Sequence, residues 1–292
     1  MANSDTDIRD RPVIGHEDVA GLNFIRSDST YLFRRYFRNG LRSHVMEVLR
    51  VADVEKETRG IEVGGIRRFP RAVPLKMLRI FRRRFDTFSE VLSEIKRVKI
   101  IEQYLTALQM ARSNEFIVGY RHGGREEILL CGLQDFVSGE AVDPWRLESV
   151  ESLSKKVRPG NGEDPDFTER LRVRLKAFIA GVKKMVLKGK HIPDLAGEGN
   201  LLLTMTGEIK LVDINNISKV AKTAEIYRDD NGYPVCDKSI EALYLLEKCQ
   251  LNREPDLDGP VYGFFLDPDR SARVREVTRA FHQGLYNVTR DP

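Results

Sequence analysis

Residues 191–214, HIPDLAGEGNLLLTMTGEIKLVDI, constrain the fold most strongly. The first ten are too rich in proline and glycine for regular structure, and they contain Asp194 and Asn200. Two apolar runs follow, and the Thr-Gly pair between them predicts a tight β-hairpin that ends just before Asp213. An amphipathic segment, residues 167–189, precedes the loop and predicts a helix. The expected order is therefore helix, irregular loop, hairpin and carboxylate.

The composition predicts a soluble, folded protein. The 292 residues are 41% apolar and 32% charged, which is enough for one large domain or two modest lobes. No run approaches the roughly 18 uncharged apolar residues of a transmembrane segment, and the first residues lack the apolar core of a secretory signal. We therefore expect a cytoplasmic location. The three cysteines are widely spaced without a CxxC pair, so we expect reduced, packed thiols and no zinc site.

The first half of the chain predicts an antiparallel five-stranded sheet that carries one helix. Residues 1–29 are polar and are expected to form an extended or partly ordered arm. Apolar spacing predicts the helix within residues 87–111. A polar loop is expected after the second strand, and Pro74 suggests an edge position or a bulge for the third. The strands are expected at residues 31–37, 45–51, 72–81, 115–121 and 127–137.

The second half is expected to be mainly helical. Besides the helix at residues 167–189, helical patterns resume near Asp237 and again from residue 271. The predicted organisation is an α+β fold with an arm at residues 1–29, an upper lobe at 30–137 and a lower lobe at 138–292.

A basic stretch runs from Arg67 to Arg84. Eight basic residues and no acidic residue lie between Ile66 and Phe85, interleaved with apolar side chains. This pattern is typical of a strand and a helix start with a solvated basic side. It is also compatible with an anionic partner, such as nucleic acid or a membrane surface, so both interpretations stay open.

The loop and hairpin resemble the catalytic and metal-binding segment of the protein-kinase-like superfamily, which carries the patterns H-R-D-L-x-x-x-N and D-F-G. His191 and Asp194 match the first pattern, and Asn200 matches its asparagine. The resemblance implies a bilobal fold, in which Asp194 is the catalytic residue that orients an acceptor hydroxyl. It also implies that Asn200 and Asp213 hold Mg²⁺, which prefers hard oxygen ligands.

Further landmarks of the family occur in the expected order. The family pairs a strand lysine that binds the ATP phosphates with a helix glutamate, and Lys76 and Glu94 are 18 residues apart. Glu90 and Glu102 remain alternative partners for Lys76. Asp237 resembles the aspartate of the helix that anchors the catalytic loop, which is a structural role.

Two more segments are expected to contact the nucleotide. Residues 134–140 resemble the hinge, where backbone groups near Asp135 and Val137 receive the adenine edge. Gly40 lies in the hairpin expected to cover the phosphates, but it is a single glycine where the family has G-x-G-x-x-G. The resemblance therefore implies weaker backbone contact with phosphate here.

The lower lobe departs from protein kinases in ways that bear on the substrate. Five residues separate Asp194 from Asn200 where the family has four, and Asn215 replaces the glycine of D-F-G. Only 79 residues follow Asp213 and no A-P-E motif appears, so a peptide-docking platform is not expected. The chain is similar in this respect to bacterial small-molecule kinases that act on aminoglycosides, choline or lipopolysaccharide-core sugars.

Three functional hypotheses follow. The first is an ATP- and Mg²⁺-dependent phosphotransferase that moves the γ-phosphate to a hydroxyl of a small or lipid-linked acceptor. The second is a pseudokinase, a kinase-shaped module that binds a nucleotide or partner without turnover. The third is a module whose basic stretch binds nucleic acid or anionic lipid. The acceptor and the oligomeric state stay open.

Overall fold

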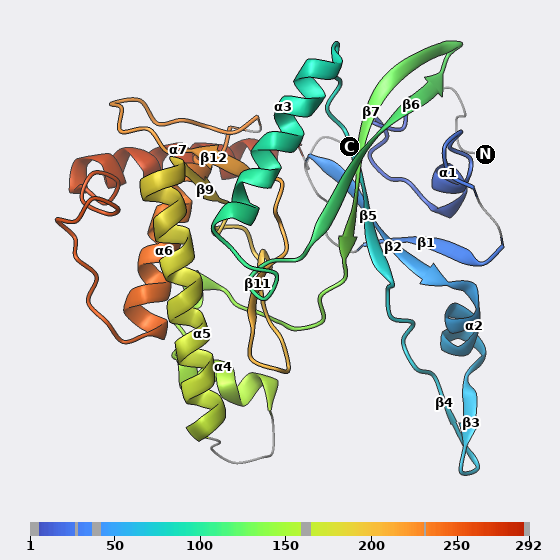
Figure 1. Cartoon of the computed structure of the whole chain (residues 1–292), viewed down its shortest axis with the longest axis horizontal. Coiled ribbons are helices and arrows are strands. Elements are labelled where there is room, and N and C mark those ends of the chain that lie inside the picture. The colour runs from blue at the N-terminus through green and yellow to red at the C-terminus, as the bar shows by residue number, and fades with distance from the viewer. Residues whose placement is uncertain (1–5, 27–28, 37–41, 159–164, 231, 289–292) are drawn as a thin grey trace. The chain divides into compact units, whose positions relative to one another are not determined.

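The computed structural model describes residues 6–26, 29–36, 42–158, 165–230 and 232–288. Contacts between Cα atoms divide the chain into two units, each described below by itself (Figure 1). Unit 1 comprises Met1–Ile95 and Arg112–Phe136, and unit 2 comprises Lys96–Ala111 and Val137–Pro292. The predicted α+β class is confirmed.

Unit 1 contains the expected five-stranded antiparallel sheet, with strand order β1-β2-β5-β7-β6. Helix α3 (Phe88–Lys99) follows β5 and ends earlier than expected, continuing as a 3₁₀ turn at Ile100–Gln103. Strand β5 pairs with neighbours on both sides, so the edge position suggested by Pro74 is wrong; the proline precedes the strand and removes no ladder hydrogen bond. The strands are β1 (Tyr31–Arg35), β2 (Ser43–Arg50), β5 (Lys76–Phe81), β6 (Ser113–His122) and β7 (Arg125–Asp135).

The N-terminal segment is part of the core of unit 1, and the expectation of an extended arm is wrong for its described residues. Helix α1 (His16–Ala20) and the residues on either side of it bury four aliphatic side chains in the cluster that contains Met46 and Ile80. Burial of apolar side chains is the main favourable term in folding, which fixes this segment despite its polar composition. The four are Ile8, Ile14, Val19 and Leu22.

The polar loop expected between the second and third strands contains a helix and a hairpin. Helix α2 (Val51–Arg59) buries none of its residues. A helix that packs no face against a core needs no apolar stripe, so the sequence did not indicate it. Strands β3 (Ile61–Val63) and β4 (Ile66–Arg68) pair across Gly64 and Gly65, which both have left-handed φ angles of 61° and 76°. A Gly-Gly pair between β-branched residues is a hairpin signal that the sequence interpretation did not use.

The second half of the basic stretch is bound inside unit 1, so a wholly solvated basic side is wrong. Arg79 is 3% exposed and donates to Ser113 Oγ at 2.7 Å and to Glu115 Oε1 at 3.0 Å. Arg82 donates to the backbone carbonyl oxygens of Arg9 and Arg11. The side chains of residues 83 and 84 bind Glu94 and the pair Asp7 and Asp10, respectively.

Unit 2 is mainly helical. Six residues at helical spacing along α5 are buried in its core, together with Leu243 of α6. The predicted helices at residues 167–189, near Asp237 and from residue 271 are present. They are α5 (Pro165–Lys184), which continues as π-helix through Met185–Gly189, then α6 (Val235–Leu245), with a π-helical end at Leu246–Gln250, and α7 (Pro268–Val288).

Short strands and one more helix complete unit 2. Helix α4 (Val150–Val157) packs against α5.

Among the described residues, no helix combines the length and apolar character needed to cross a bilayer. Cys131 and Cys236 are buried free thiols, as expected from their spacing. The strands are β8 (Glu140–Ala141), β9 (His191–Pro193), β10 (Leu201–Leu203), β11 (Ile209–Leu211) and β12 (Ile217–Lys219).

Candidate functional site

Two short strand pairs bring the predicted lower-lobe residues together. Strand β9 pairs antiparallel with β12, so Asp194, directly after β9, lies beside Asn216, directly before β12. Strands β10 and β11 form the predicted hairpin, and Asn200 and Asp213 flank it. The backbone N–H of Val212 donates to the carbonyl of Asn200 at 2.8 Å, which closes the base of this hairpin.

Asp194 is a buried carboxylate with a full set of donors. Its side chain is 8% exposed. Oδ1 accepts from the backbone N–H of Ala196 at 2.9 Å and from that of Gly197 at 3.1 Å. Oδ2 accepts from Asn216 Nδ2 at 3.3 Å. These three donors hold the carboxylate in one orientation, which a residue that must align an acceptor hydroxyl requires.

The environment of Asp194 changes its acidity. Burial disfavours the ionised form and, with the nearby negative charge of Asp213, raises the pKa of Asp194 to about 6. The hydrogen bonds from Ala196, Gly197 and Asn216 act in the opposite direction and offset part of this effect. The carboxylate is therefore mostly ionised at neutral pH and is more basic than an ordinary aspartate.

Asn200 is tied to the same loop. Its Nδ2 donates to the backbone carbonyl of Asp194 at 3.1 Å, and its backbone N–H donates to the carbonyl of Gly197 at 3.2 Å. A Cβ at residue 197 would clash with the Asn200 amide, so glycine is needed there. Gly199 has a left-handed φ of 71°, which lets the loop turn back into β10. These two glycines accommodate the additional residue between Asp194 and Asn200.

Asp213 presents a carboxylate beside Asp194. Its Oδ1 accepts from the backbone N–H of Asn215 at 3.2 Å, and within the described residues this is its one hydrogen bond. Asn215, which stands where the kinase family has glycine, does not adopt a left-handed φ, so a side chain is tolerated there. Half-buried Asp213 therefore keeps carboxylate lone pairs that no other described donor occupies.

The loop that carries Asp194 is anchored from α6 and from the turn before α4. Ser239 of α6 accepts from the N–H of Leu195 at 3.1 Å, and both residues are fully buried. Trp145 Nε1 donates to the carbonyl of Ala196 at 3.1 Å. Lys238 lies over the Trp145 ring, with Nζ 4.1 Å from its centroid. Burial and then the charge of Asp194 raise the pKa of Tyr233, which is near this loop.

Asn216, Ser239 and Trp145 support the site, yet the sequence interpretation gave none of them a role in it. Asn216 contacts Asp194 only because β9 pairs with β12, and each of these strands has three residues. Such short strands leave almost no periodic pattern in a sequence. His191, which matches the kinase histidine, is half-buried and donates from Nδ1 to the carbonyl of Gly189 at 2.7 Å.

The predicted residues of unit 1 have different partners from those expected. Lys76 and Asp135 are paired across β5 and β7, and their side chains form an ion pair in which both are more than 40% exposed. Glu94 is buried and accepts from Arg83 Nη1 at 3.3 Å. The structure therefore pairs Lys76 with the predicted hinge residue.

The alternative partners of Lys76 are also engaged elsewhere. Glu90 Oε2 accepts from the N–H of Asp86 at 3.1 Å, and Thr87 Oγ1 accepts from the N–H of Glu90 at 3.3 Å, which together cap α3. Glu102 pairs with Lys99 at 2.6 Å. Among the described residues, none of the three glutamates considered from the sequence pairs with Lys76.

The structure adds little about the two other residues predicted to contact the nucleotide, Val137 and Gly40. Val137 follows β7, is half-buried, and its backbone makes no hydrogen bond to the described part of the chain. Gly40 lies outside the described residues.

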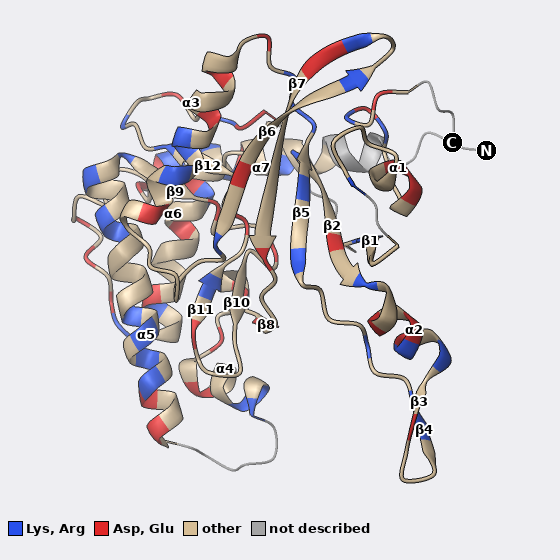
Figure 2. Ribbon diagram, turned by 45° about the vertical axis from the view of Figure 1, so that its right-hand side comes forward, with Lys and Arg blue, Asp and Glu red and all other residues tan. Residues whose placement is uncertain are grey.

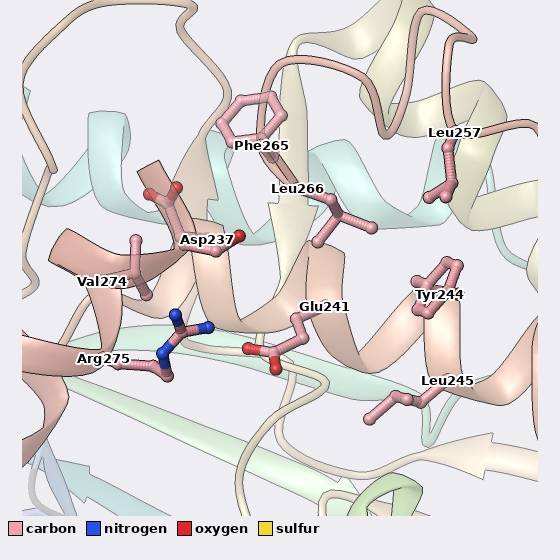
Figure 3. Close-up of a pocket in the computed structure, with 10 residues that line it drawn as sticks. Asp237, Glu241, Tyr244, Leu245, Leu257, Phe265, Leu266, Val274 and Arg275 are labelled. Atoms are coloured by element: carbon pink, nitrogen blue, oxygen red, sulfur yellow. The ribbon is translucent and has the colours of Figure 1, made fainter. Parts of the chain in front are cut away.

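A separate cavity of about 270 Å³ lies in unit 2 between α6, α7 and residues 251–267 (Figure 3). Asp237 lines it and is held by a buried ion pair with Arg270, whose Nε donates to Oδ1 at 2.6 Å. Asp194 and Asp213 do not line this cavity. Its wall is mixed, consisting of Asp237, Glu241, Tyr244, Leu245, Leu257, Phe265, Leu266, Ser271, Val274 and Arg275.

The donor set beside Asp194 is small. In the parts of the chain that the structure describes, no three or more His, Cys, Asp or Glu side chains are grouped to hold a metal ion. Asp213 and Asn200 offer one carboxylate and one amide oxygen. This is a weak site for a metal alone. Mg²⁺, the metal expected from the sequence, commonly binds through one or two protein oxygens, water and substrate phosphates.

Comparisons with known proteins do not assign a family. No protein-family model matches the chain, and no curated protein matches it in sequence.

Proposed function

We propose that the chain is an ATP- and Mg²⁺-dependent phosphotransferase that acts on a hydroxyl of a small or lipid-linked acceptor. In this reaction the acceptor oxygen forms a bond to the γ-phosphorus, the bond from the γ-phosphorus to ADP breaks, and the hydroxyl proton passes to Asp194. Positioning and charge stabilisation supply most of the catalysis of phosphoryl transfer.

The environment of Asp194 is the observation that carries this proposal. A structural aspartate usually gains a cation, whereas Asp194 is buried beside a second carboxylate, Asp213, and held by neutral donors. Perturbed carboxylates of this kind are concentrated at functional sites. A pKa of about 6 lets Asp194 be ionised at neutral pH and still accept a proton more readily than ordinary aspartate.

Asn200 and Asp213 would hold Mg²⁺ through amide and carboxylate oxygens. When bound, the ion would neutralise charge on the phosphates. The proposal assigns Lys76 to phosphate binding. Its ion pair with Asp135 is exposed, and exposed pairs contribute about 0–1 kcal/mol, so exchanging this partner costs little.

Turnover of ATP tests this proposal. We expect Mg²⁺-dependent release of ADP by the full chain, stimulated by a hydroxyl-bearing acceptor from a panel of aminoglycosides, sugars and lipid-linked sugars. Asp194→Asn should lower kcat by about 10²-fold or more, within the range of general-base catalysis. Asp269→Asn, a substitution at an exposed position of α7, is the matched control and should not alter kcat. Equal activity in wild type and Asp194→Asn would refute the role of Asp194.

A pseudokinase is the second candidate, and the ion pairs of unit 1 favour it. An active kinase of this family requires its strand lysine to be paired with the helix glutamate. Here Lys76 binds Asp135 and Glu94 binds Arg83. This candidate predicts ATP binding with no turnover for any acceptor, and with the same affinity in Asp194→Asn as in wild type.

A further inference from the structure

The β3–β4 hairpin and the residues that lead back to the sheet, residues 60–71, form a projection. From here on we call this projection the arm; it is a different segment from residues 1–29. Figure 1 shows the hairpin beyond α2, extending away from the five-stranded sheet. Every residue from 61 to 71 is exposed. A two-stranded hairpin without a core is marginally stable in water, so an arm of this kind has a reason other than stability to be present.

One face of the arm carries three aliphatic side chains and Arg68, and the opposite face carries Glu62 and Arg67. The register pairs Val63 with Ile66 and Ile61 with Arg68, and directly paired residues lie on the same face of a hairpin. Ile61, Val63 and Ile66 are 37%, 47% and 61% exposed. Phe69, beyond the end of β4, is 60% exposed. Contiguous exposed apolar side chains mark interaction surfaces, whereas isolated ones are ordinary.

The base of the arm is fixed to the sheet. Arg34 of β1 binds Glu47 of β2 at 2.6 Å and Glu57 of α2 at 2.7 Å. Gly60, with a left-handed φ of 75°, joins α2 to β3, and a Cβ there would meet the side chains of Arg67 and Phe69. The polypeptide therefore holds the hairpin at a defined position instead of leaving it as a free loop.

The arm carries three exposed arginines, Arg67, Arg68 and Arg71. Arg67 and Arg68 are exposed and form no ion pair with any described residue. The side chain of Arg71 is 70% exposed and reaches Glu47 only at 3.5 Å. Glu62 is the single acidic residue of the arm. Figure 2 shows the basic residues on β4 and on the segment that returns to the sheet.

We propose that the arm docks on an anionic lipid bilayer. The aliphatic side chains Ile61, Val63 and Ile66 enter the interface, and Arg68 on the same face binds a headgroup phosphate. Arg67, on the opposite face, adds positive charge beside the bilayer. Apolar side chains at the tip with basic side chains beside them are the pattern of interfacial anchors. This inference goes beyond the proposed function and does not depend on it.

The same residues disfavour two other occupants. A ribbon that reads nucleic acid presents polar side chains to base edges, while the arm presents three aliphatic ones. A second copy of the chain would bring the arginines of two arms together without neutralising them. An anionic bilayer offers phosphate groups to the arginines and an apolar interface to the aliphatic side chains.

Co-sedimentation of the full chain with vesicles tests the proposal. We expect binding to phosphatidylcholine vesicles that contain about a third phosphatidylserine, weaker binding at high salt, and little binding to phosphatidylcholine alone. Ile61→Ser/Ile66→Ser and Arg67→Gln/Arg68→Gln should each lower the partition coefficient at least tenfold. The matched controls are Val173→Ser/Met205→Ser, two exposed apolar positions of unit 2, and Arg275→Gln/Arg279→Gln on α7, and both should bind as wild type.

A second measurement locates the contact. The chain has one tryptophan, Trp145, and Ile66→Trp adds a reporter at the tip of the arm. Its emission should shift to the blue on anionic vesicles, while that of Met205→Trp should not. Unchanged emission in the Ile66→Trp protein, equal sedimentation of all variants, binding to duplex RNA or DNA in place of vesicles, or dimerisation that Ile61→Ser/Ile66→Ser abolishes would each overturn the proposal.

Discussion

Asp194 and Asn216 are joined by two hydrogen bonds. The backbone N–H of Asp194 donates to the carbonyl of Asn216 at 2.8 Å, and Asn216 Nδ2 donates to Asp194 Oδ2 at 3.3 Å. The first bond belongs to the backbone and survives most substitutions, whereas the second depends on the amide. Residue 216 therefore offers a way to change the acidity of Asp194 without moving the strand that positions it.

Asn216→Ala removes a donor that stabilises the ionised form of Asp194. We expect the pKa of Asp194 to rise above its value of about 6, because burial and the charge of Asp213 are then less strongly opposed. Carbon-13 NMR of the aspartate carboxyl groups during a pH titration measures this shift. Asn114→Ala, at an exposed position of unit 1, is the control. A lower pKa in Asn216→Ala would contradict the assignment of the hydrogen bond.

Asp194→Asn should stabilise the protein at neutral pH while lowering kcat by about 10²-fold or more. The folded pKa of about 6 lies above the ordinary value of 3.8, so the fold favours the protonated carboxyl. The ionised carboxylate therefore lowers the free energy of unfolding, and this loss grows as pH rises from about 4 to about 6 and is complete above that range. The difference between these two pKa values corresponds to up to about 3 kcal/mol. Urea unfolding should show a gain for Asp194→Asn at pH 7.5 that disappears at pH 4; a loss at both pH values would contradict the account.

Ser239→Ala should weaken the anchor of the loop that carries Asp194. The change leaves the buried N–H of Leu195 without its acceptor, and an unsatisfied buried donor costs about 1–3 kcal/mol. Urea unfolding of Ser239→Ala and of Ser152→Ala, an exposed serine of α4, measures the difference. If the two variants are equally stable, Ser239 does not support the loop.

The buried ion pair Arg270–Asp237 should contribute more to stability than the exposed ion pair Lys76–Asp135. Asp237→Ala leaves the Arg270 guanidinium buried without its carboxylate, which should cost about 3–5 kcal/mol of the free energy of unfolding. Asp135→Asn breaks the exposed pair with Lys76 and should cost about 1 kcal/mol or less. Thermal unfolding of both variants at pH 7.5 is the measurement, and equal losses would show that burial does not distinguish the pairs.

The sequence predicted the elements that have strong apolar periodicity. The strands of unit 1 and the helices α5 and α6 contribute side chains to the buried cores, and their residue patterns show it. Among the described side chains of α7, only Arg270 and Val274 are buried. Helix α2 buries none of its residues, so no strong apolar stripe marked it. The arm is marked only by the Gly-Gly pair between Val63 and Ile66, which the sequence interpretation did not use. The polar N-terminal segment contributes only four core aliphatic residues, too few to outweigh its composition in a sequence interpretation.

The candidate site divides in the same way. The hairpin fixes the spacing of Asn200 and Asp213, so their proximity followed from the sequence. The partners of Lys76 and Glu94 did not, because each lies within reach of more than one charge and strand register decides between them. Asn216 became part of the site only through the three-residue pairing of β9 with β12.

Thermal unfolding with ATP alone and with ATP plus Mg²⁺ tests the central claim most directly, namely that the residues around Asp194 form a magnesium–nucleotide site. A ligand that binds only the folded state stabilises it by about 2.7 kcal/mol at a concentration of 100 Kd. We predict a Mg²⁺-dependent rise in Tm for wild type that is lost in Asp213→Ala and retained in Asp269→Asn. No rise at millimolar ATP and Mg²⁺, or an equal rise in Asp213→Ala, would contradict the claim.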